Sequence, residues 1–273
     1  GRRGDDPVPR LIEPGDAPAI SLEEAVDTLA TTTIDVADED GIASLGPLLA
    51  RLGRNHRFLG DLAIAELKDR HQRQRRNSYG AQVMMLHPGD GRFIIRANFW
   101  PAQDDPLVRA SGPAAFFYGF AHDHNFPFLT YGYAGPGYWS EDYEVADPDA
   151  PAPVLISTGR TRLAPGRLML YRAHRDVHVQ HPPEELSVSL NILAQHPGQK
   201  WRDQRHYDVA NGTVVRAMTT TPSEALVALA VHFGGGNGLD LATTLATRHP
   251  SPRMRATAAA ALASITAAAD PVS

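Results

Sequence analysis

A block of short β-type segments begins near residue 79 and limits the folds open to this chain. Its β-branched and aromatic runs are separated by Gly, Pro and Asp, which favour turns. The strand candidates are "AQVMML", "RFIIRANFW", "AAFFYGFAHDH", "FLTYGYA", "PVLISTG", "RLMLYRA" and "LSVSLNILAQ". Many short strands with few helices between them favour an antiparallel sandwich or barrel over a parallel sheet. The sequence therefore predicts a mainly β fold for residues 79–218, and this block holds the candidate functional residues.

Helical patterns flank this block on both sides. Residues 1–20 are rich in Pro, Gly and charge, and we expect a loose tail there. Residues 21–78 are expected to be helical, and Ser21 and Glu24 have the spacing of a capping box at the first helix. Residues 219–273 also have helical periodicity. We expect these C-terminal helices to pack on the barrel or on a second copy of the chain, so a homodimer is compatible with the pattern.

Composition excludes several kinds of site and partner. The chain has 273 residues, 42% of them hydrophobic, which is enough for one large domain with a sizeable core. A formal net charge of −5 gives no general attraction to nucleic acid. The absence of cysteine excludes disulfides, thiolate metal ligands and a cysteine nucleophile. No segment has the apolar length of a signal peptide or a membrane span, so we expect a cytoplasmic protein with neither membrane nor nucleic acid as a partner.

A pair of histidines lies in the most aromatic part of the chain. The stretch "FAHDHNFPFL", residues 120–129, places one residue between His122 and His124. Side chains two apart on a strand project to the same side, so both histidines can reach one metal ion while Asp123 points away. The alternative interpretation is a histidine pair without function that shares a strand face by chance.

The residues around this pair resemble the metal motif of the cupin barrels. In that family the two histidines are followed by a glutamate and then a glycine; here Phe128 stands at the glutamate position and Gly135 at the glycine position. A later segment, "APGRLMLYRAHRDVHVQ", resembles the second cupin motif, which supplies another histidine. The resemblance implies a cupin-type antiparallel β-barrel, or jelly roll, with helical segments before and after it. It also implies the metal ligands His122, His124 and His178.

Two other histidines are alternatives for the third ligand. His178 lies one residue beyond the family spacing counted from Gly166, and His174 and His181 are the alternatives. A narrower resemblance, to the three-histidine thiol dioxygenases of the cysteine dioxygenase type, favours His178. In that family the third histidine begins the segment that here reads "HVQHPPEELSVSLNIL". The resemblance implies a divalent metal, with iron(II) expected, no organic cofactor, and an oxygen-dependent reaction of dioxygen with a small anionic substrate such as a thiol or amino acid derivative.

The ligand chemistry is consistent with that expectation. Imidazole suits iron, nickel, copper and zinc alike, and three imidazoles leave coordination positions open on the metal. Neutral ligands also leave the full metal charge in place, which favours direct binding of an anionic substrate.

Four residues are candidates for the substrate side of the site. The thiol dioxygenases bind the substrate carboxylate with an arginine followed by asparagine, and Arg76 is the match here. Arg96 is a second candidate, because a charge within the strand "FIIRANFW" must face either solvent or a polar pocket. Tyr131 is a candidate for the pocket lining, and Ser189 matches a serine of the family's last strand.

The chain departs from the thiol dioxygenases at two further positions. Asn191 and Leu193 stand where that family has a histidine and a tyrosine. Cysteine itself is therefore not the expected substrate. Two other functions fit the same residues: a zinc or nickel isomerase or lyase, and a metal-binding cupin without catalysis that acts as a sensor or binding protein.

Overall fold

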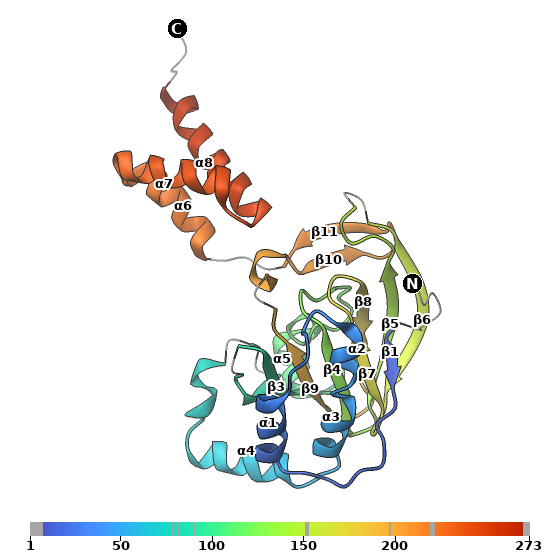
Figure 1. Cartoon of the computed structure of the whole chain (residues 1–273). Coiled ribbons are helices and arrows are strands. Elements are labelled where there is room, and N and C mark those ends of the chain that lie inside the picture. The colour runs from blue at the N-terminus through green and yellow to red at the C-terminus, as the bar shows by residue number, and fades with distance from the viewer. Residues whose placement is uncertain are drawn as a thin grey trace. The chain divides into compact units, whose positions relative to one another are not determined.

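The chain forms two compact units in the computed structural model, which describes residues 8–77, 79–80, 82–89, 91–150, 153–196, 198–218 and 222–269. One unit comprises residues 1–199 and 204–216, and the other comprises residues 200–203 and 217–273. The first unit holds the sheets and the predicted site residues (Figure 1). None of the helices in the described ranges combines the length and the apolarity that a membrane span requires.

Two antiparallel sheets form the barrel of the first unit. The larger sheet has the strand order β1-β7-β4-β9-β3-β2, and the smaller has the order β6-β5-β8. The strands are β1 (Arg10–Ile12), β2 (Val83–His87), β3 (Phe93–Trp100), β4 (Phe128–Ala134), β5 (Tyr138–Val145), β6 (Leu155–Leu163), β7 (Leu168–Tyr171), β8 (Asp176–Gln180) and β9 (Ser187–Ala194). From β4 to β9 the chain passes repeatedly from one sheet to the other. This strand order is that of a jelly roll, the barrel type of the cupins, and it confirms the predicted fold class.

The segment before β4 extends the smaller sheet without forming a regular strand. Isolated bridges join Tyr118 to Gln180 and His122 to His178. The sequence pattern predicts a continuous strand over residues 114–124, but η2 (Pro113–Phe116) is a 3-10 turn and Phe117 has a φ of 61°. A residue in the left-handed region cannot belong to a strand, so the ladder is interrupted there.

Helices cover the outer face of the larger sheet. They are α1 (Leu22–Thr31), α2 (Glu39–Ala43), α3 (Gly46–Gly53) and α4 (Phe58–Lys68), followed by the 3-10 turn η1 (Arg73–Arg76). The predicted capping box is present, because the Ser21 hydroxyl accepts from the Glu24 amide and the Glu24 carboxylate accepts from the Ser21 amide. Leu29, Leu49 and Leu52 from these helices share one hydrophobic core with Ile95 and Leu190 from the sheet. The predicted N-terminal helices and the predicted strands therefore belong to the same unit.

Part of the N-terminal segment belongs to the larger sheet. A loose tail is the sequence-based expectation for residues 1–20, but β1 pairs with β7 in an antiparallel register. Val8 and Ile20, on either side of β1, are buried, at 2% and 5% exposure. These apolar side chains anchor a stretch whose Pro and Gly content is typical of a coil.

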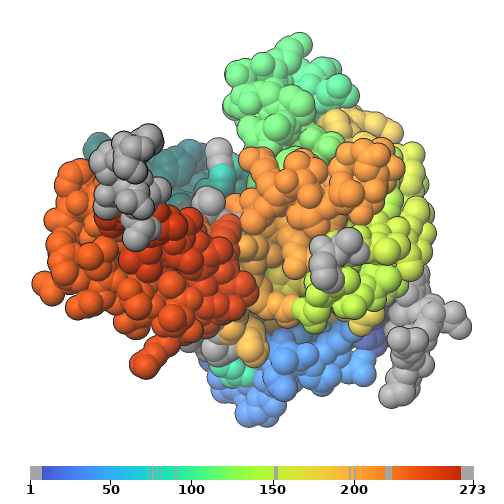
Figure 2. All heavy atoms as spheres, turned by 90° about the horizontal axis from the view of Figure 1, so that it is seen from above, coloured from blue at the N-terminus to red at the C-terminus, as the bar shows by residue number. Residues whose placement is uncertain are grey.

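The remaining elements follow the barrel strands or lie between them. They are α5 (Pro106–Ser111), η3 (Gln199–Trp201), β10 (Arg205–Asp208) and β11 (Thr213–Ala217) in the order of the chain. Figure 2 shows the β10–β11 hairpin, in orange, at the surface next to the yellow-green segment that follows β5. Consistent with this view, the Arg205 guanidinium donates to the Pro148 carbonyl oxygen over 3.1 Å.

The second unit is helical. It contains α6 (Pro222–Phe233), α7 (Gly235–Arg248) and α8 (Pro252–Ala269). Val231, Ala242, Met254 and Ala258 are members of its own small core. The Arg253 guanidinium lies within ion-pair distance of carboxylates from both segments of this unit, Asp203 and Glu224.

Candidate metal centre

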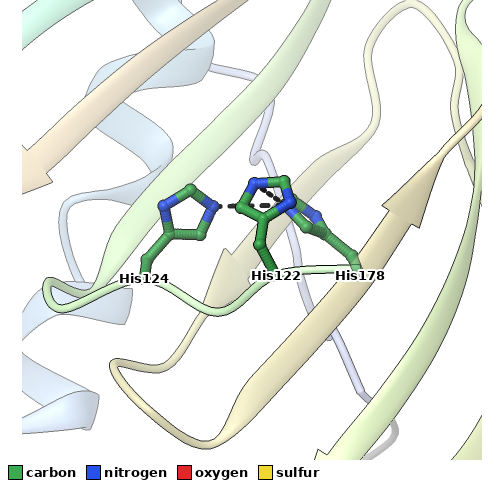
Figure 3. Close-up of side chains that lie close together, drawn as sticks. All are labelled: His122, His124 and His178. Carbon is green, nitrogen blue, oxygen red and sulfur yellow. Dashed lines mark hydrogen bonds between the residues drawn. The ribbon is translucent and has the colours of Figure 1, made fainter. Parts of the chain in front are cut away.

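Three histidines converge inside the barrel. His122 and His124 come from the segment before β4, and His178 comes from β8 (Figure 3). The Nε2 atom of His178 lies 3.2 Å from Nε2 of His124 and 3.2 Å from Nε2 of His122. One ring nitrogen from each residue lies within 4.8 Å of the other two. The structure thus brings together the three residues that the sequence predicts as metal ligands, across 54 to 56 residues of chain.

Two of the three nitrogen–nitrogen distances in this group fit ligation of one divalent metal ion. With nitrogen–metal bonds of about 2.1 Å, two ligand nitrogens lie about 3.0 Å apart at a right angle and about 3.4 Å apart at a tetrahedral angle. The two measured distances of 3.2 Å fall between these values. The donor set, three imidazoles without a thiolate or carboxylate, suits iron, nickel, copper or zinc. The three-histidine group can therefore bind a divalent metal.

The protonation state of the histidines also suits ligation. His122 Nδ1 lies 2.8 Å from the Phe120 carbonyl oxygen, so it donates there and leaves the Nε2 lone pair free for a metal. Burial lowers the pKa of His122 to about 4 and holds the pKa values of His124 and His178 well below the usual value. All three imidazoles are consequently neutral near pH 7, which is the form that binds metals.

Aromatic packing holds the imidazole rings in place. The Phe128 ring centroid lies 4.7 Å from that of His124, and the Tyr171 centroid lies 4.7 Å from that of His178. Phe128 and Tyr171 themselves stack, with an interplanar angle of 7°. Within the described residues, Nδ1 of His124 and Nδ1 of His178 have no hydrogen-bond partner. Ring contacts therefore fix the orientation of these two side chains.

Asp123, between the two histidines, points to the opposite side, as the strand geometry predicts. Its carboxylate accepts from the Arg205 amide over 2.5 Å and from the Tyr207 hydroxyl over 3.1 Å. The Tyr207 amide donates to the Ala121 carbonyl oxygen, so β10 pairs with the segment that carries the ligands. Asp123 therefore attaches β10 to the outer side of the ligand segment and has no direct part in the three-histidine group.

The two alternative third ligands lie elsewhere. His174 Nδ1 is 3.5 Å from the Asp123 carboxylate, on the side away from the three-histidine group. His181 Nε2 lies 3.1 Å from the Glu141 carboxylate, and its side chain is partly exposed. Neither residue belongs to the metal-binding group found among the described residues. Of the three candidates, only His178 meets His122 and His124.

The histidines open into a cavity of about 260 Å³. This is room for several water molecules or for one small metabolite. Residues that line it with the histidines are Tyr79, Gly80, Gln82, Val83, Arg96, Asn98, Trp100, Phe117, Phe126, Phe128, Tyr138, Gln180, Asn191 and Gln204. The wall is thus largely aromatic, with carboxamides and one guanidinium among the rings.

Arg96 supplies the positive charge of this wall. Its side chain is 7% exposed, and the guanidinium carbon lies 4.6 Å from the Tyr79 ring centroid and 6.0 Å from that of Phe126. Burial lowers the pKa of Arg96, but an arginine remains protonated in proteins. Among the described lining residues none is acidic, so the cavity favours an anion.

Two of the other predicted substrate residues, Tyr131 and Ser189, do not line the cavity. Tyr131 lies on the outer face of β4, in the core beneath the helices, where a Cβ at Gly53 of α3 would overlap its ring. Ser189 is buried at 1% exposure and accepts a hydrogen bond of 3.0 Å from the indole of Trp100, so it lies behind a lining residue. Tyr131 differs from the expectation because strand alternation places it on the outer face of its sheet. Ser189 shares the inner face of β9 with Asn191, but the Trp100 side chain lies between it and the cavity. Arg76 belongs to η1, and its side chain lies outside the described residues.

Sequence reasoning missed the carboxamides of the wall. Asn98 lies two residues from Arg96 on the same face of β3, and Asn191 is the cross-strand partner of Arg96 on β9. Gln82 immediately precedes β2, whose first residue pairs with Asn98. The available signal was two polar residues at alternate positions of the apolar run "FIIRANFW", which indicates a strand face that meets a polar cavity.

No protein-family model matches the chain, and no curated protein matches it. The solved structures that are similar include a hydroquinone 1,2-dioxygenase in complex with Cd²⁺ and 4-hydroxybenzonitrile, at 13% identity and a TM-score of 0.28, covering 45% of this chain and 69% of that one. A cupin domain from Bordetella pertussis is 13% identical with a TM-score of 0.27, covering 43% and 96%. A DMSP lyase from Ruegeria pomeroyi is 11% identical with a TM-score of 0.27, covering 68% and 78%. At these TM-scores the similarities have no bearing on the chemistry of this chain.

Proposed function

We propose that this chain is a metal-dependent oxygenase that binds iron(II) through His122, His124 and His178 and uses dioxygen to oxidise a small anionic substrate. The observation that carries the proposal is the position of three converging imidazole nitrogens in the wall of a cavity whose lining includes Arg96 and no described acidic residue. The small substrate and dioxygen are the proposed partners.

The chain's own residues prepare this site for an anion. When bound, iron(II) supplies a centre at which dioxygen and an anionic group of the substrate can be held next to each other. The Arg96 guanidinium attracts a carboxylate into the cavity, and its low-polarity surroundings strengthen that attraction. Phe126, Phe128 and Trp100 line the cavity with apolar surface, which limits competition from water for the substrate. The hydrogen bond from His122 to Phe120 keeps one imidazole in the ligating tautomer.

The test combines metal analysis with dioxygen consumption. The full chain is reconstituted with iron(II) without oxygen, its metal content is measured by elemental analysis, and oxygen uptake is recorded with a panel of small carboxylates and thiols. We expect about one metal ion per chain and uptake with at least one compound. The Arg96→Met variant should retain the metal but need at least about tenfold more substrate, because it loses a charge-assisted contact.

Each outcome leads to a different conclusion. A chain that holds no metal after reconstitution contradicts the proposal. Stoichiometric metal without oxygen uptake contradicts the oxygenase reaction while leaving the metal site in place, and conversion of a substrate without oxygen would then indicate an isomerase or lyase. Equal substrate requirements for the parent chain and Arg96→Met would exclude Arg96 as the anion-binding residue.

A further inference from the structure

The cavity also has a polar part, where several buried polar atoms have no hydrogen-bond partner among the described residues. Within the described residues, Gln82 Oε1, Arg96 Nε, Asn98 Oδ1 and Asn191 Nδ2 are buried without a hydrogen-bond partner. These four side chains are between 2% and 7% exposed, and all four line the cavity. We call them the polar wall. Buried polar groups are normally paired, so four unpaired atoms on side chains that line one cavity indicate that this wall pairs with a ligand.

The sheet places the members of the polar wall next to one another. Arg96 and Asn191 are directly opposite on neighbouring strands β3 and β9. Asn98 is two positions along β3 on the same face, and its backbone neighbour Phe99 donates to the carbonyl oxygen of Gln82. Cross-strand neighbours have Cβ atoms about 5 Å apart, so one small molecule can contact Arg96 and a carboxamide at the same time.

The chemical character of the polar wall restricts the ligand. Arg96 suits a carboxylate, whereas the three carboxamides offer both carbonyl oxygens and NH₂ groups. A plain carboxylate would pair Arg96 and leave carboxamide groups unpaired. A ligand ammonium group would find no described acidic residue in the lining and would lie near a guanidinium and a divalent ion. A neutral hydroxyl or amide, which both donates and accepts, fits the carboxamides without this repulsion.

We infer that the substrate is a carboxylate that carries a neutral hydrogen-bonding group, a hydroxyl or an amide, within a few bonds of the carboxylate, and that Gln82, Asn98 and Asn191 bind this group. The inference rests on the proposed function for the position of the metal, and it narrows the substrate beyond an anion. The inference predicts that the site prefers such acids over unsubstituted acids and over zwitterionic amino acids of the same carbon skeleton.

The test uses probes that differ in one substituent. Binding of propanoate, 2-hydroxypropanoate, 3-hydroxypropanoate, alanine and 3-aminopropanoate to the metal-reconstituted full chain is measured by calorimetry without oxygen. We expect at least one hydroxy acid to bind about three- to tenfold more tightly than propanoate, the gain of about one neutral hydrogen bond. We expect the same hydroxy acid to bind more tightly than the amino acid of the same carbon skeleton, by at least the same factor.

Variants assign the preference to the polar wall. Asn98→Leu and Asn191→Leu keep the side-chain shape and remove the carboxamide, so they should abolish the hydroxyl preference, measured as the ratio of hydroxy-acid to propanoate affinity, while the metal content stays that of the parent. Gln195→Leu is the control, because this carboxamide follows β9 and does not line the cavity. It should retain the preference.

Three results would overturn the inference: tighter binding of the amino acids, equal binding of propanoate and both hydroxy acids, or a hydroxyl preference that survives in both leucine variants. Absence of binding for every probe would overturn it too. The same binding series on the metal-free chain tests the inference independently of the proposed function. The polar wall should still favour the hydroxy acid over propanoate and over the amino acid there. Missing metal or missing oxygen uptake would then reject the proposed reaction alone.

Discussion

The two faces of the larger sheet differ in what they contact, although both are buried. On β3, Ile95 and Ala97 face the helices and are each 0% exposed, whereas Arg96 and Asn98 face the cavity and are each 7% exposed. The outer face is filled by aliphatic side chains from α1, α2 and α3. The inner face leaves a cavity and several unpaired polar atoms.

Burial alone therefore does not separate a stabilising face from a functional one. The outer face gains free energy of folding from dense apolar packing. The inner face carries unpaired polar groups, each of which costs about 1 to 3 kcal/mol of stability. Proteins retain unpaired buried polar groups at sites where a ligand binds to them, despite the loss of stability. Substitutions on one face of the sheet at a time therefore test whether the two faces differ in this way.

The largest effect on folding stability is expected on the outer face. Leu190→Ala removes a side chain that is 0% exposed and should lower the free energy of unfolding by about 2 to 5 kcal/mol, through lost apolar burial and the cavity that remains. Metal content of the folded protein should stay unchanged, since Leu190 faces away from the histidines. Urea denaturation with elemental analysis measures both quantities. Loss of metal from the folded variant would show that the two faces are coupled.

The next effect concerns metal binding on the inner side of the barrel. His178→Ala removes the imidazole that lies 3.2 Å from both other ligand nitrogens, and the affinity for a divalent metal should fall by more than about a hundredfold. A competition assay with a chromogenic chelator measures this change. His181→Ala is the matched control, because that histidine pairs with Glu141 outside the group. Full retention of metal by His178→Ala would remove it from the ligand set.

Acid should destabilise the metal-free protein through the same histidines. His122 has its pKa lowered to about 4 by burial, so the unfolded chain binds more protons than the folded chain between pH 6.5 and 4. Its stabilising contribution is complete above pH 6.5 and decreases as the pH falls, by on the order of 2 kcal/mol between pH 7 and 5. Asp142 acts in the opposite direction, because burial raises its pKa to about 7.

The variant His122→Gln isolates this contribution. Glutamine has no charge to acquire in this range, so the loss of stability between pH 7 and 5 should be smaller in the variant than in the parent. Thermal denaturation of both metal-free proteins across this range gives the comparison. Identical pH dependence would show that His122 does not titrate below its usual range.

The smallest effect is a gain in stability from the polar wall. Asn98→Leu replaces a buried carboxamide that has an unpaired oxygen with an apolar side chain of similar shape. The free energy of unfolding should rise by about 1 kcal/mol, the reverse of the change on the outer face. Urea denaturation at pH 7 measures it. A loss of stability instead would mean that the carboxamide is well paired in the free protein.

Local sequence signals predicted a substantial part of the fold. The capping box at Ser21 starts α1, and the runs around "MML" and "FIIRANFW" form the antiparallel pair of β2 and β3. Strands β5 and β8 were not predicted, because buried polar residues such as Ser140, Asp142 and His178 interrupt their apolar patterns. Hydrophobic periodicity reports apolar faces, and it fails where a strand face is polar and buried.

Residue patterns alone predicted a mainly β chain with helices at both ends, and they predicted that His122 and His124 project to one side with Asp123 on the other. These features depend on turn chemistry, periodicity and the alternation of neighbouring residues. The folded structure was needed to place His178 and not His174 with the pair, to pack Tyr131 under the helices, and to bring Arg96, Asn98 and Asn191 to one cavity. Those outcomes depend on the pairing register between strands far apart in the chain, where a shift of one residue would reverse every face.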